Sequence, residues 1–443
     1  MLAPPSPVVV VPGITASELH DEYELPPEVL WSAVRRKNYD RVALHPGDRR
    51  YEFLEPARVS PRGPLPLIYE ELIEELRDEL AEHLSGPVPV FPFGYDWRMP
   101  LEWTEERLAA FVAEVIDRTS LLRHYRDVGY ATSPTVTLIG HSMGGLLIAG
   151  YLERHGAGLV DRVVTIATPF SGSHEAILAM ATGTSDLTDT SGKARERRVA
   201  RMTPSLYYLL PSFEGALTVD EGGEADIFSP EAWQPSIARA LHRQVAEWGA
   251  SGDDLFRLLL DEARAHRERI AALRLGAPGA GSASDPFGSG PPPEPLPRRR
   301  WLAIVGVDAE TRTGLRVRLD EGGSPRFDLR AAERRNEWNR DGTAARRQTG
   351  DGTVALAGAL PPFMDERHVV CVAPSDFGYW ELRDRALSGL AGLHGTLPKM
   401  NMLHRMIIRF LLKKDDRYDN TWGRRVPGAA EWAPPLTLRE KGC

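Results

Sequence analysis

A serine between two glycines is the feature of this sequence that most directly indicates chemistry. Gly140-His141-Ser142-Met143-Gly144 follows an apolar run over residues 135–139 and opens a second apolar run of helical character. A sharp turn from a strand into a helix forces the serine into a strained backbone conformation, and the glycines remove the Cβ atoms that would collide there. The amino terminus of the helix favours negative charge near the serine oxygen. We therefore predict that Ser142 is a nucleophile.

A serine hydroxyl needs a base that takes its proton and a carboxylate that orients the base. In proteins with this kind of turn the three residues follow one another in the order Ser, Asp, His. Asp351 lies in Gly350-Asp351-Gly352, a turn suited to presenting a carboxylate at a strand end. The alternative interpretation is an ordinary Asp-Gly turn. We predict that Asp351 orients the base.

Several histidines are candidates for that base. His394 lies in a loop expected between the last strand and the last helix, where an imidazole is accessible, and it is our choice. His404 is the second choice, although its place in the final helix beside an arginine favours a surface histidine. His368 begins a strand and is expected to be a structural edge residue, and His266 is more distant, in an inserted region.

The tetrahedral intermediate of acyl transfer needs hydrogen-bond donors for its oxyanion. One donor is expected to be the backbone N–H of Met143, directly after the nucleophile. The second is expected from the loop after the first strand, Val11-Pro12-Gly13-Ile14-Thr15, where the N–H of Ile14 is the best candidate. A plain turn at Pro-Gly is the alternative for that loop.

The elements that position these residues follow from the pattern of apolar residues. Six short, uniformly apolar runs are typical of strands that are buried on both faces. They cover residues 8–11, 88–91, 135–139, 162–167, 301–306 and 368–373. Apolar residues at three- and four-residue steps predict helices over 69–84, 108–116 and 400–411, with Thr104 as the expected N-cap of the second. The alternation predicts an α/β fold with a mostly parallel, doubly wound sheet flanked by helices.

The alternation of strands and helices is interrupted once. We predict residues 1–171 as the N-terminal part of the core, 172–300 as an inserted cap, 301–415 as the C-terminal part of the core and 416–443 as a tail. A tract rich in Pro, Gly and Ser, residues 276–297, predicts a flexible loop inside the cap.

Composition excludes several classes of protein. The chain has 443 residues, a net charge of −8 and two cysteines. The acidic balance argues against nucleic acid as a partner and limits any membrane contact to a local, transient one. The low cysteine count and the missing signal and membrane-spanning patterns predict a cytoplasmic protein. No metal or cofactor motif is present, so none is expected, and no pattern predicts the oligomeric state.

Several ordered segments of the chain match the motifs of a known family. In chain order they are Val10 to Ile14 with Glu18-Leu19, Tyr95-Asp96-Trp97-Arg98, His141 to Gly145, Thr168 to Ser173, Pro204 to Pro211, Gly350 to Val354 and His394-Gly395. Together they resemble the lecithin:cholesterol acyltransferase family, which includes lysosomal phospholipase A2 and phospholipid:diacylglycerol acyltransferases. The resemblance implies an α/β-hydrolase fold, a triad of Ser142, Asp351 and His394, and an oxyanion hole formed by Ile14 and Met143.

Other residues receive weaker expectations from the same comparison. Asp96 and Arg98 are expected to form a structural ion pair near the site rather than to act in catalysis. Trp31 lies where the family carries a lid-like element, here residues 30–40. Tyr207 and Tyr208 belong to an apolar stretch consistent with a greasy substrate. Animal members of the family carry disulfides that this chain lacks.

A basic cluster just upstream of that apolar stretch has two interpretations. It is either a solvated helix face, which is the usual role of a charge run, or a contact for phospholipid headgroups. Its members are Arg195, Arg197, Arg198 and Arg201.

The function expected from these features is acyl transfer from a lipid ester through an acyl-enzyme, with hydrolysis favoured over transfer to an alcohol. A general carboxylesterase or lipase that acts on non-phospholipid esters is the first alternative. A hydrolase-fold protein that only recruits a partner is the second, and the complete set of triad residues in order argues against it.

Overall fold

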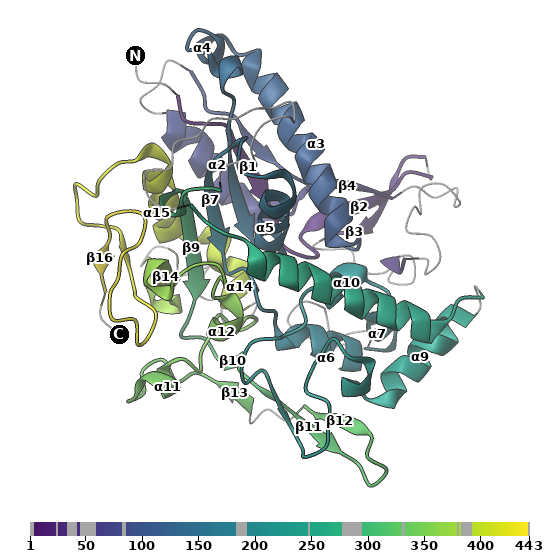
Figure 1. The fold of residues 1–443 in the computed structure, drawn as a ribbon. Coiled ribbons are helices and arrows are strands. Elements are labelled where there is room, and N and C mark those ends of the chain that lie inside the picture. Colours follow the sequence, from purple (N-terminus) through teal and green to yellow (C-terminus); the bar gives the residue numbers. More distant parts are fainter. Residues whose placement is uncertain are drawn as a thin grey trace.

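Six parallel strands form the centre of the molecule. The computed structural model describes residues 4–23, 25–32, 42–44, 59–81, 86–182, 193–246, 249–276, 295–329, 333–378, 381 and 392–441. The strands lie in the order β14-β9-β7-β6-β1-β5, and each neighbouring pair is parallel. Their bounds are β1 Val8–Val11, β5 Val90–Pro92, β6 Val136–His141, β7 Val160–Ile166, β9 Trp301–Gly306 and β14 Val369–Val372. All six predicted strands lie in this one sheet (Figure 1).

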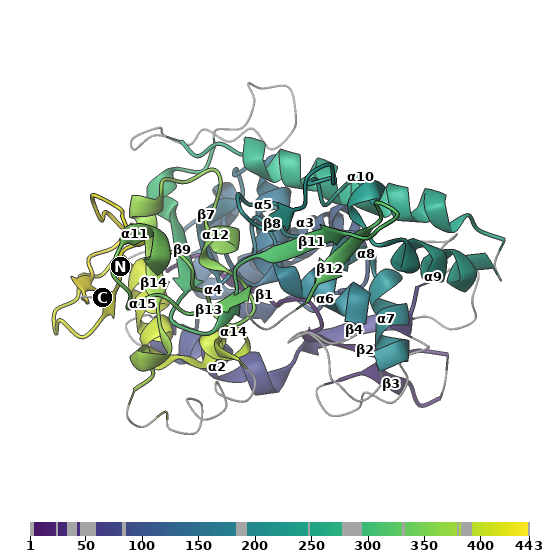
Figure 2. The same ribbon diagram turned by 90° about the horizontal axis from the view of Figure 1, so that it is seen from below.

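Helices cover both faces of the sheet, because successive residues of each strand point into two separate cores. In β1, Val8 and Val10 pack with α2 (Pro66–Ala81) and α15 (Asn401–Leu412). Val9 and Val11 pack on the other face, among side chains of three helices. These helices are α3 (Leu101–Ser120), α5 (Met143–His155) and α10 (Gly252–Ala272), as Figure 2 shows from a second side. This confirms the predicted fold class, an α/β sheet with helices on both faces.

Two local predictions were wrong. Thr104 is not an N-cap, since α3 begins at Leu101 after Pro100, and the Thr104 hydroxyl donates to the Pro100 carbonyl from inside the first turn. The helix starts earlier than predicted because Leu101 is itself a fully buried core residue. His394 lies in a short helix, α14 (Leu393–Thr396), rather than in a loop. The predicted end of the first helix, residues 82–84, lies outside the described residues.

Residues 172–300, which are predicted to be an inserted cap and are here called the inserted segment, are mainly helical where the structure describes them. One short strand of this segment, β8 (Leu217–Val219), pairs with β11 (Leu315–Leu319), which follows β9. β11 in turn pairs with β12 (Pro325–Asp328), so a three-stranded sheet ties the inserted segment to the chain beyond β9. The other helices of the segment are α6 His174–Thr182, α7 Lys193–Arg201, α8 Pro204–Tyr207 and α9 Pro235–Val245.

Smaller elements complete the fold. A second three-stranded sheet follows β1 and has the order β3-β2-β4. The bounds of the remaining strands and helices are β2 Ser17–Asp21, β3 Glu28–Trp31, β4 Val59–Pro64, α4 Arg123–Arg126, β10 Thr311–Arg312, β13 Arg334–Arg335, α11 Thr343–Arg346, α12 Leu356–Ala359, β15 Trp422–Gly423 and β16 Arg439–Glu440. No helix in the described ranges is both long enough and apolar enough to cross a membrane.

The ends of the Pro/Gly/Ser-rich tract are hydrogen-bonded to one another. The N–H of Gly276 donates to the carbonyl of Leu296, and the N–H of Arg298 donates back to the carbonyl of Gly276, over 2.9 and 3.1 Å. Most of the tract, residues 277–294, lies outside the described residues. The chain therefore leaves the inserted segment and returns to it at adjacent points.

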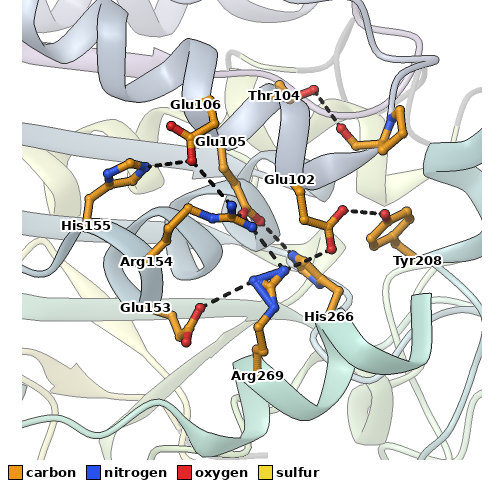
Figure 3. A network of polar contacts seen from close by, with 11 residues as sticks. Glu102, Thr104, Glu105, Glu106, Glu153, Arg154, His155, Tyr208, His266 and Arg269 are labelled. Carbon is orange, nitrogen blue, oxygen red and sulfur yellow. Dashed lines mark hydrogen bonds and ion pairs between the residues drawn. The ribbon is translucent and has the colours of Figure 1, made fainter. Parts of the chain in front are cut away.

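A buried polar network joins α10 of the inserted segment to α3 and α5 of the core (Figure 3). Its centre is the fully buried Glu105 of α3, whose Oε1 accepts a hydrogen bond of 2.8 Å from Nε2 of His266 on α10. Arg154 of α5 lies 3.4 Å from the other Glu105 oxygen. Arg269, one turn beyond His266, pairs with Glu102 at 2.9 Å. The network fixes the orientation of α10 on the core.

We expect Glu105→Ala to lower the free energy of unfolding by roughly 3–5 kcal/mol, because it breaks a buried ion pair and leaves the His266 donor without its acceptor. The matched control is Glu106→Ala on the same helix, whose side chain is 54% exposed and should cost less than about 1 kcal/mol. Urea denaturation of both variants measures the difference. Equal losses would show that the buried carboxylate does not hold α10 in place.

Candidate active site

The predicted nucleophile lies on a sharp turn between a strand and a helix. β6 ends at His141, α5 begins at Met143, and Ser142 between them has φ 54° and ψ −128°, a strained conformation for a residue with a side chain. The turn leaves no space for larger neighbours. A Cβ atom on Gly144 would lie 2.2 Å from the Val11 carbonyl oxygen. The sharp turn therefore depends on glycine and presents the Ser142 side chain at the carboxyl end of β6.

The structure brings Ser142, His394 and Asp351 together in one hydrogen-bonded line. His394 Nε2 lies 2.8 Å from Ser142 Oγ, and His394 Nδ1 lies 2.7 Å from Asp351 Oδ2. A carboxylate can only accept, so Nδ1–H donates to Asp351 and Nε2 is left to accept the serine proton. All three side chains are buried. The arrangement has the geometry of a nucleophile, a general base and an orienting carboxylate.

Asp351 is held in place by its own turn. Its Oδ1 accepts the backbone N–H groups of Thr353 and Val354 at 3.0 and 2.7 Å, and Oδ2 accepts from His394. Strand β9 ends directly against it, since a Cβ on Gly306 would lie 2.5 Å from the Asp351 Cβ. These contacts leave the carboxylate one orientation, aimed at the imidazole.

The loop after β1 lies against the nucleophile. A Cβ atom on Gly13 would lie 2.9 Å from the Cβ of Ser142, so the neighbouring Ile14 is adjacent to the site. Among the described residues, neither the N–H of Ile14 nor that of Met143 donates to a backbone carbonyl of a loop or turn. Met143 is also the first residue of α5, where the helix dipole favours negative charge.

A second hydrogen-bonded chain connects the loop after β1 to His394. The N–H of Gly13 donates to the Tyr69 hydroxyl at 2.9 Å, and that hydroxyl lies 2.7 Å from Nδ1 of His141. Nε2 of His141 lies 3.0 Å from the backbone carbonyl of His394. Because that carbonyl can only accept, Nε2 carries the proton, and Tyr69 donates to Nδ1. The chain therefore runs in a single direction from Gly13 to His394.

Burial keeps the side chains of Tyr69 and His141 neutral. It lowers the pKa of His141 well below its usual value, an effect to which the nearby His394 adds, and it raises the pKa of Tyr69. From the sequence, Tyr69 is expected only as a core residue of a helix, and His141 is not expected to have a role of its own. A signal was present, since a polar residue directly before the nucleophile and inside an apolar strand needs a buried partner.

Asp96 and Arg98 form a buried bidentate ion pair with contacts of 2.8 and 2.6 Å. Arg98 also donates to the carbonyl of Val42, so the pair connects two loops. Trp31 ends β3, is buried, and donates from Nε1 to the carbonyl of Thr15 in the loop of the candidate oxyanion hole. The rest of the lid-like stretch, residues 33–40, lies outside the described residues.

Tyr207 and Tyr208 are buried in the inserted segment. The Tyr207 hydroxyl donates to the carbonyl of Arg201, and the Tyr208 hydroxyl donates to Glu102 in the network of Figure 3. Both side chains thus support the packing of the inserted segment, and neither hydroxyl is bonded to the Ser142 array.

The basic cluster has a structural role that neither interpretation anticipated. Arg197 and Arg201 of α7 donate to the carbonyls of Thr182 and Met180, in the last turn of α6. Cationic side chains interact favourably with the carbonyl groups at the carboxyl end of a helix. Arg198 is exposed, and the Arg195 side chain lies outside the described residues.

The three other candidate histidines have structural contacts. His368 lies directly before the edge strand β14 and bonds to the carbonyl of Ala433. His266 belongs to the network around Glu105. His404 was predicted to be a surface residue, which is wrong: it is buried, and its Nε2 donates to the Pro398 carbonyl at 2.7 Å. It is enclosed where α15 packs on α2, whose Glu71 and Glu75 lie near it.

Burial of His404 predicts acid sensitivity. Its Nδ1 has no hydrogen-bond partner in the described structure, and burial lowers its pKa below the ordinary 6.5. The unfolded chain therefore takes up the proton first, and this contribution to stability is lost as the pH falls below 6.5, by at most about 1.4 kcal/mol per pH unit. Urea denaturation at pH 7 and pH 5.5 should show a smaller loss in His404→Gln than in the original protein. An equal loss in both would contradict the assignment.

A parallel sheet with helices on both faces, and with a serine on a sharp turn at the carboxyl end of a central strand, defines the fold as that of the α/β-hydrolases. The solved structure described as "The crystal structure of Tle4-Tli4 complex" is similar over 82% of this chain and 90% of that chain, with 16% identity and a TM-score of 0.51. The structure of the Bacillus licheniformis lipase BlEst2 in mature form has 15% identity, a TM-score of 0.18, and coverage of 57% and 76%.

The sequence also matches a family model. The family is described as lecithin:cholesterol acyltransferase, and the match covers residues 46–261. This confirms the family resemblance that the sequence motifs predict. A search among curated proteins gave no match. Within the described ranges no group of three or more His, Cys, Asp or Glu residues is arranged to hold a metal ion.

Proposed function

We propose that this protein is a serine-dependent enzyme that transfers the acyl group of a lipid ester, with water as the favoured acceptor. The observation that carries the proposal is the hydrogen-bonded line of Ser142, His394 and Asp351 on a strained turn. The family match supports a lipid ester as the substrate, because it is to a family described as an acyltransferase of lecithin and cholesterol.

In the first half of the reaction, Ser142 Oγ attacks the ester carbonyl while His394 Nε2 takes the serine proton. The carbonyl oxygen becomes an oxyanion, and the N–H groups of Met143 and Ile14 are proposed to donate to it. Asp351 stabilises the imidazolium that has formed. The bond to the alcohol portion of the lipid then breaks, His394 returns its proton to the leaving oxygen, and the acyl group stays on Ser142.

In the second half, the acceptor attacks the acyl-enzyme. His394 removes the proton of a water molecule or of an alcohol, the acyl bond to Ser142 breaks, and the serine recovers its proton. Water yields a free fatty acid, and an alcohol yields a new ester. The same residues serve both outcomes, so the acceptor depends on how the site is covered. We propose the inserted segment as that cover.

The proposal includes a reducing, cytoplasmic setting, which is supported by the presence of only two cysteines in the whole chain. A contact with the surface of a membrane is expected only while the lipid ester is being taken up.

The test is an analysis of products from phosphatidylcholine vesicles that contain a long-chain alcohol, with lipids resolved by mass spectrometry. We expect free fatty acid from the original protein and none from Ser142→Ala. Ser236→Ala, which changes an exposed serine of α9, serves as the control and should retain activity. Acylated alcohol as the main product would make the enzyme a transferase.

Two further outcomes would change the proposal. Labelling of Ser142 by a fluorophosphonate without any lipid product would favour the general carboxylesterase or lipase of non-phospholipid esters. Absence of labelling in folded protein would remove the catalytic interpretation and leave a hydrolase-fold protein that acts through interactions.

A further inference from the structure

A polar pocket lies at the edge of the central sheet opposite to Ser142. Ser142 follows the carboxyl end of β6, whereas Arg162 stands near the amino end of the neighbouring β7 and Arg300 directly precedes β9. Because all strands of the sheet are parallel, their amino ends share one edge. Its lining includes the cationic side chains of Arg162, Arg299, Arg300, Arg409, Lys413 and Lys414.

The pocket has an excess of positive charge. Six of its lining side chains are cationic and only one is acidic. Two more carboxylates contact the cations: Asp161 lies 3.7 Å from Arg162 and 3.8 Å from Arg300, and Asp416 lies 2.6 Å from Arg409. The cations still outnumber the carboxylates two to one, in a chain whose net charge is −8. This local charge is therefore not a reflection of the overall composition.

Arg162 carries the clearest sign of an unfilled site. Its guanidinium lies over the ring of Phe410, 4.7 Å from the ring centroid. Its buried Nε lies 3.7 Å from the Asp161 carboxylate, and no described residue forms a hydrogen bond with it. Burial lowers the pKa of Arg162 despite the nearby Asp161, and Arg300 and Arg299 lower it further. The fold thus holds like charges together in a partly buried place, at an electrostatic cost that a bound anion would relieve.

Local structure explains only part of this cluster. Lys413 and Lys414 follow the carboxyl end of α15, where the helix dipole favours cations. Arg409 is held by Asp416 and by the side chain of Asn420. Neither effect accounts for Arg299 and Arg300, which come from a different part of the chain and face the same pocket. Convergence of cations from separate segments is typical of an anion-binding site.

We propose that this pocket binds a soluble small molecule that carries phosphoryl groups. Arginine forks and lysine ammonium groups together suit phosphoryl oxygens, and several cations call for a ligand with more than one negative charge. Phosphoryl groups also occur on lipid headgroups. A membrane bound at this pocket would, however, lie at the end of the sheet that faces away from Ser142, and for this reason we favour a soluble ligand. The proposal does not depend on the reaction at Ser142.

The test is binding of pyrophosphate to the full-length protein, measured by calorimetry and by thermal unfolding at constant ionic strength. The variant Arg299→Gln with Lys413→Gln removes two of the cations that line the pocket. The control Arg123→Gln with Arg340→Gln removes two cations that are 87% and 72% exposed elsewhere. We expect saturable binding and a raised Tm in the original protein and in the control, and affinity at least roughly tenfold weaker in the pocket variant.

Equal binding by the pocket variant and the control, or no binding to the original protein, would overturn the proposal. A second arm offers phosphatidylserine vesicles in place of pyrophosphate. Vesicle binding that is lost in the pocket variant, without any pyrophosphate binding, would replace the soluble ligand by a membrane surface. Hydrolysis of a soluble p-nitrophenyl ester should be the same in all three proteins, which separates this site from the one at Ser142.

Discussion

Ser142→Ala and His394→Ala are each expected to reduce kcat for ester hydrolysis by roughly 10⁶-fold, with Asp351→Ala reducing it less, by roughly 10⁴-fold. The relative size of these losses in kcat follows from the geometry of the site. Ser142 and His394 exchange the proton directly across 2.8 Å, whereas Asp351 acts only on the orientation and charge of His394. The residues act as a unit, so the double variant of Ser142 and His394 should be no slower than either single variant.

Steady-state hydrolysis of p-nitrophenyl esters measures these losses, with far-ultraviolet circular dichroism as the check on folding. Ser236→Ala is the matched serine control. Losses that multiply in the double variant would mean that Ser142 and His394 act independently, and a fully active His394→Ala would assign the base to another residue.

Tyr69→Phe is expected to give the second largest effect, a decrease in kcat of roughly 100-fold with little change in KM. The substitution removes one hydroxyl, which accepts from Gly13 and donates to His141. Gly13 is next to Ile14, a proposed oxyanion donor, and His141 donates to the backbone of His394. Loss of the hydroxyl therefore loosens both sides of the site. Misplacement of a catalytic group by about 1 Å lowers the rate by roughly 100-fold.

The control for this prediction is Tyr125→Phe, which also removes a buried tyrosine hydroxyl. That hydroxyl bonds to the carbonyl of Pro5 and is not part of the network at Ser142. Tyr69→Phe removes two hydrogen bonds and Tyr125→Phe removes one, so the loss of stability is expected to be somewhat larger in Tyr69→Phe. If kcat falls equally in both, Tyr69 has no positioning role.

The central sheet was predictable from the sequence because most of its strands are buried on both faces, the edge strand β5 being the clearest exception. Val8–Val11 of β1 and Trp301–Gly306 of β9 are continuous apolar runs, a pattern that few other structures produce. The turn at Ser142 was predictable because its geometry demands glycine at fixed positions. Asp351 and His394, 43 residues apart, were placed by chain order and by turn composition, and the fold brings them within 2.7 Å.

What could not be predicted depends on contacts between distant segments. β11 alternates apolar and charged residues from Leu315 to Leu319, a strand pattern, but its partner β8 is nearly 100 residues earlier and only three residues long. The burial of His404 depends on how α15 packs on α2, more than 300 residues earlier in the chain. The same holds for Tyr69 and His141, whose separate positions in the chain give no sign that their side chains meet.

The hydrogen bonds that join Gly276 to Leu296 and Arg298 determine how much the length of the chain between these residues can change. These hydrogen bonds hold the two backbone segments together without the 19 residues that lie between Gly276 and Leu296. The entropy of closing such a loop changes only slowly with its length. Insertions, deletions or a fused peptide at this point are therefore compatible with an unchanged core, and the site at Ser142 is insulated from them.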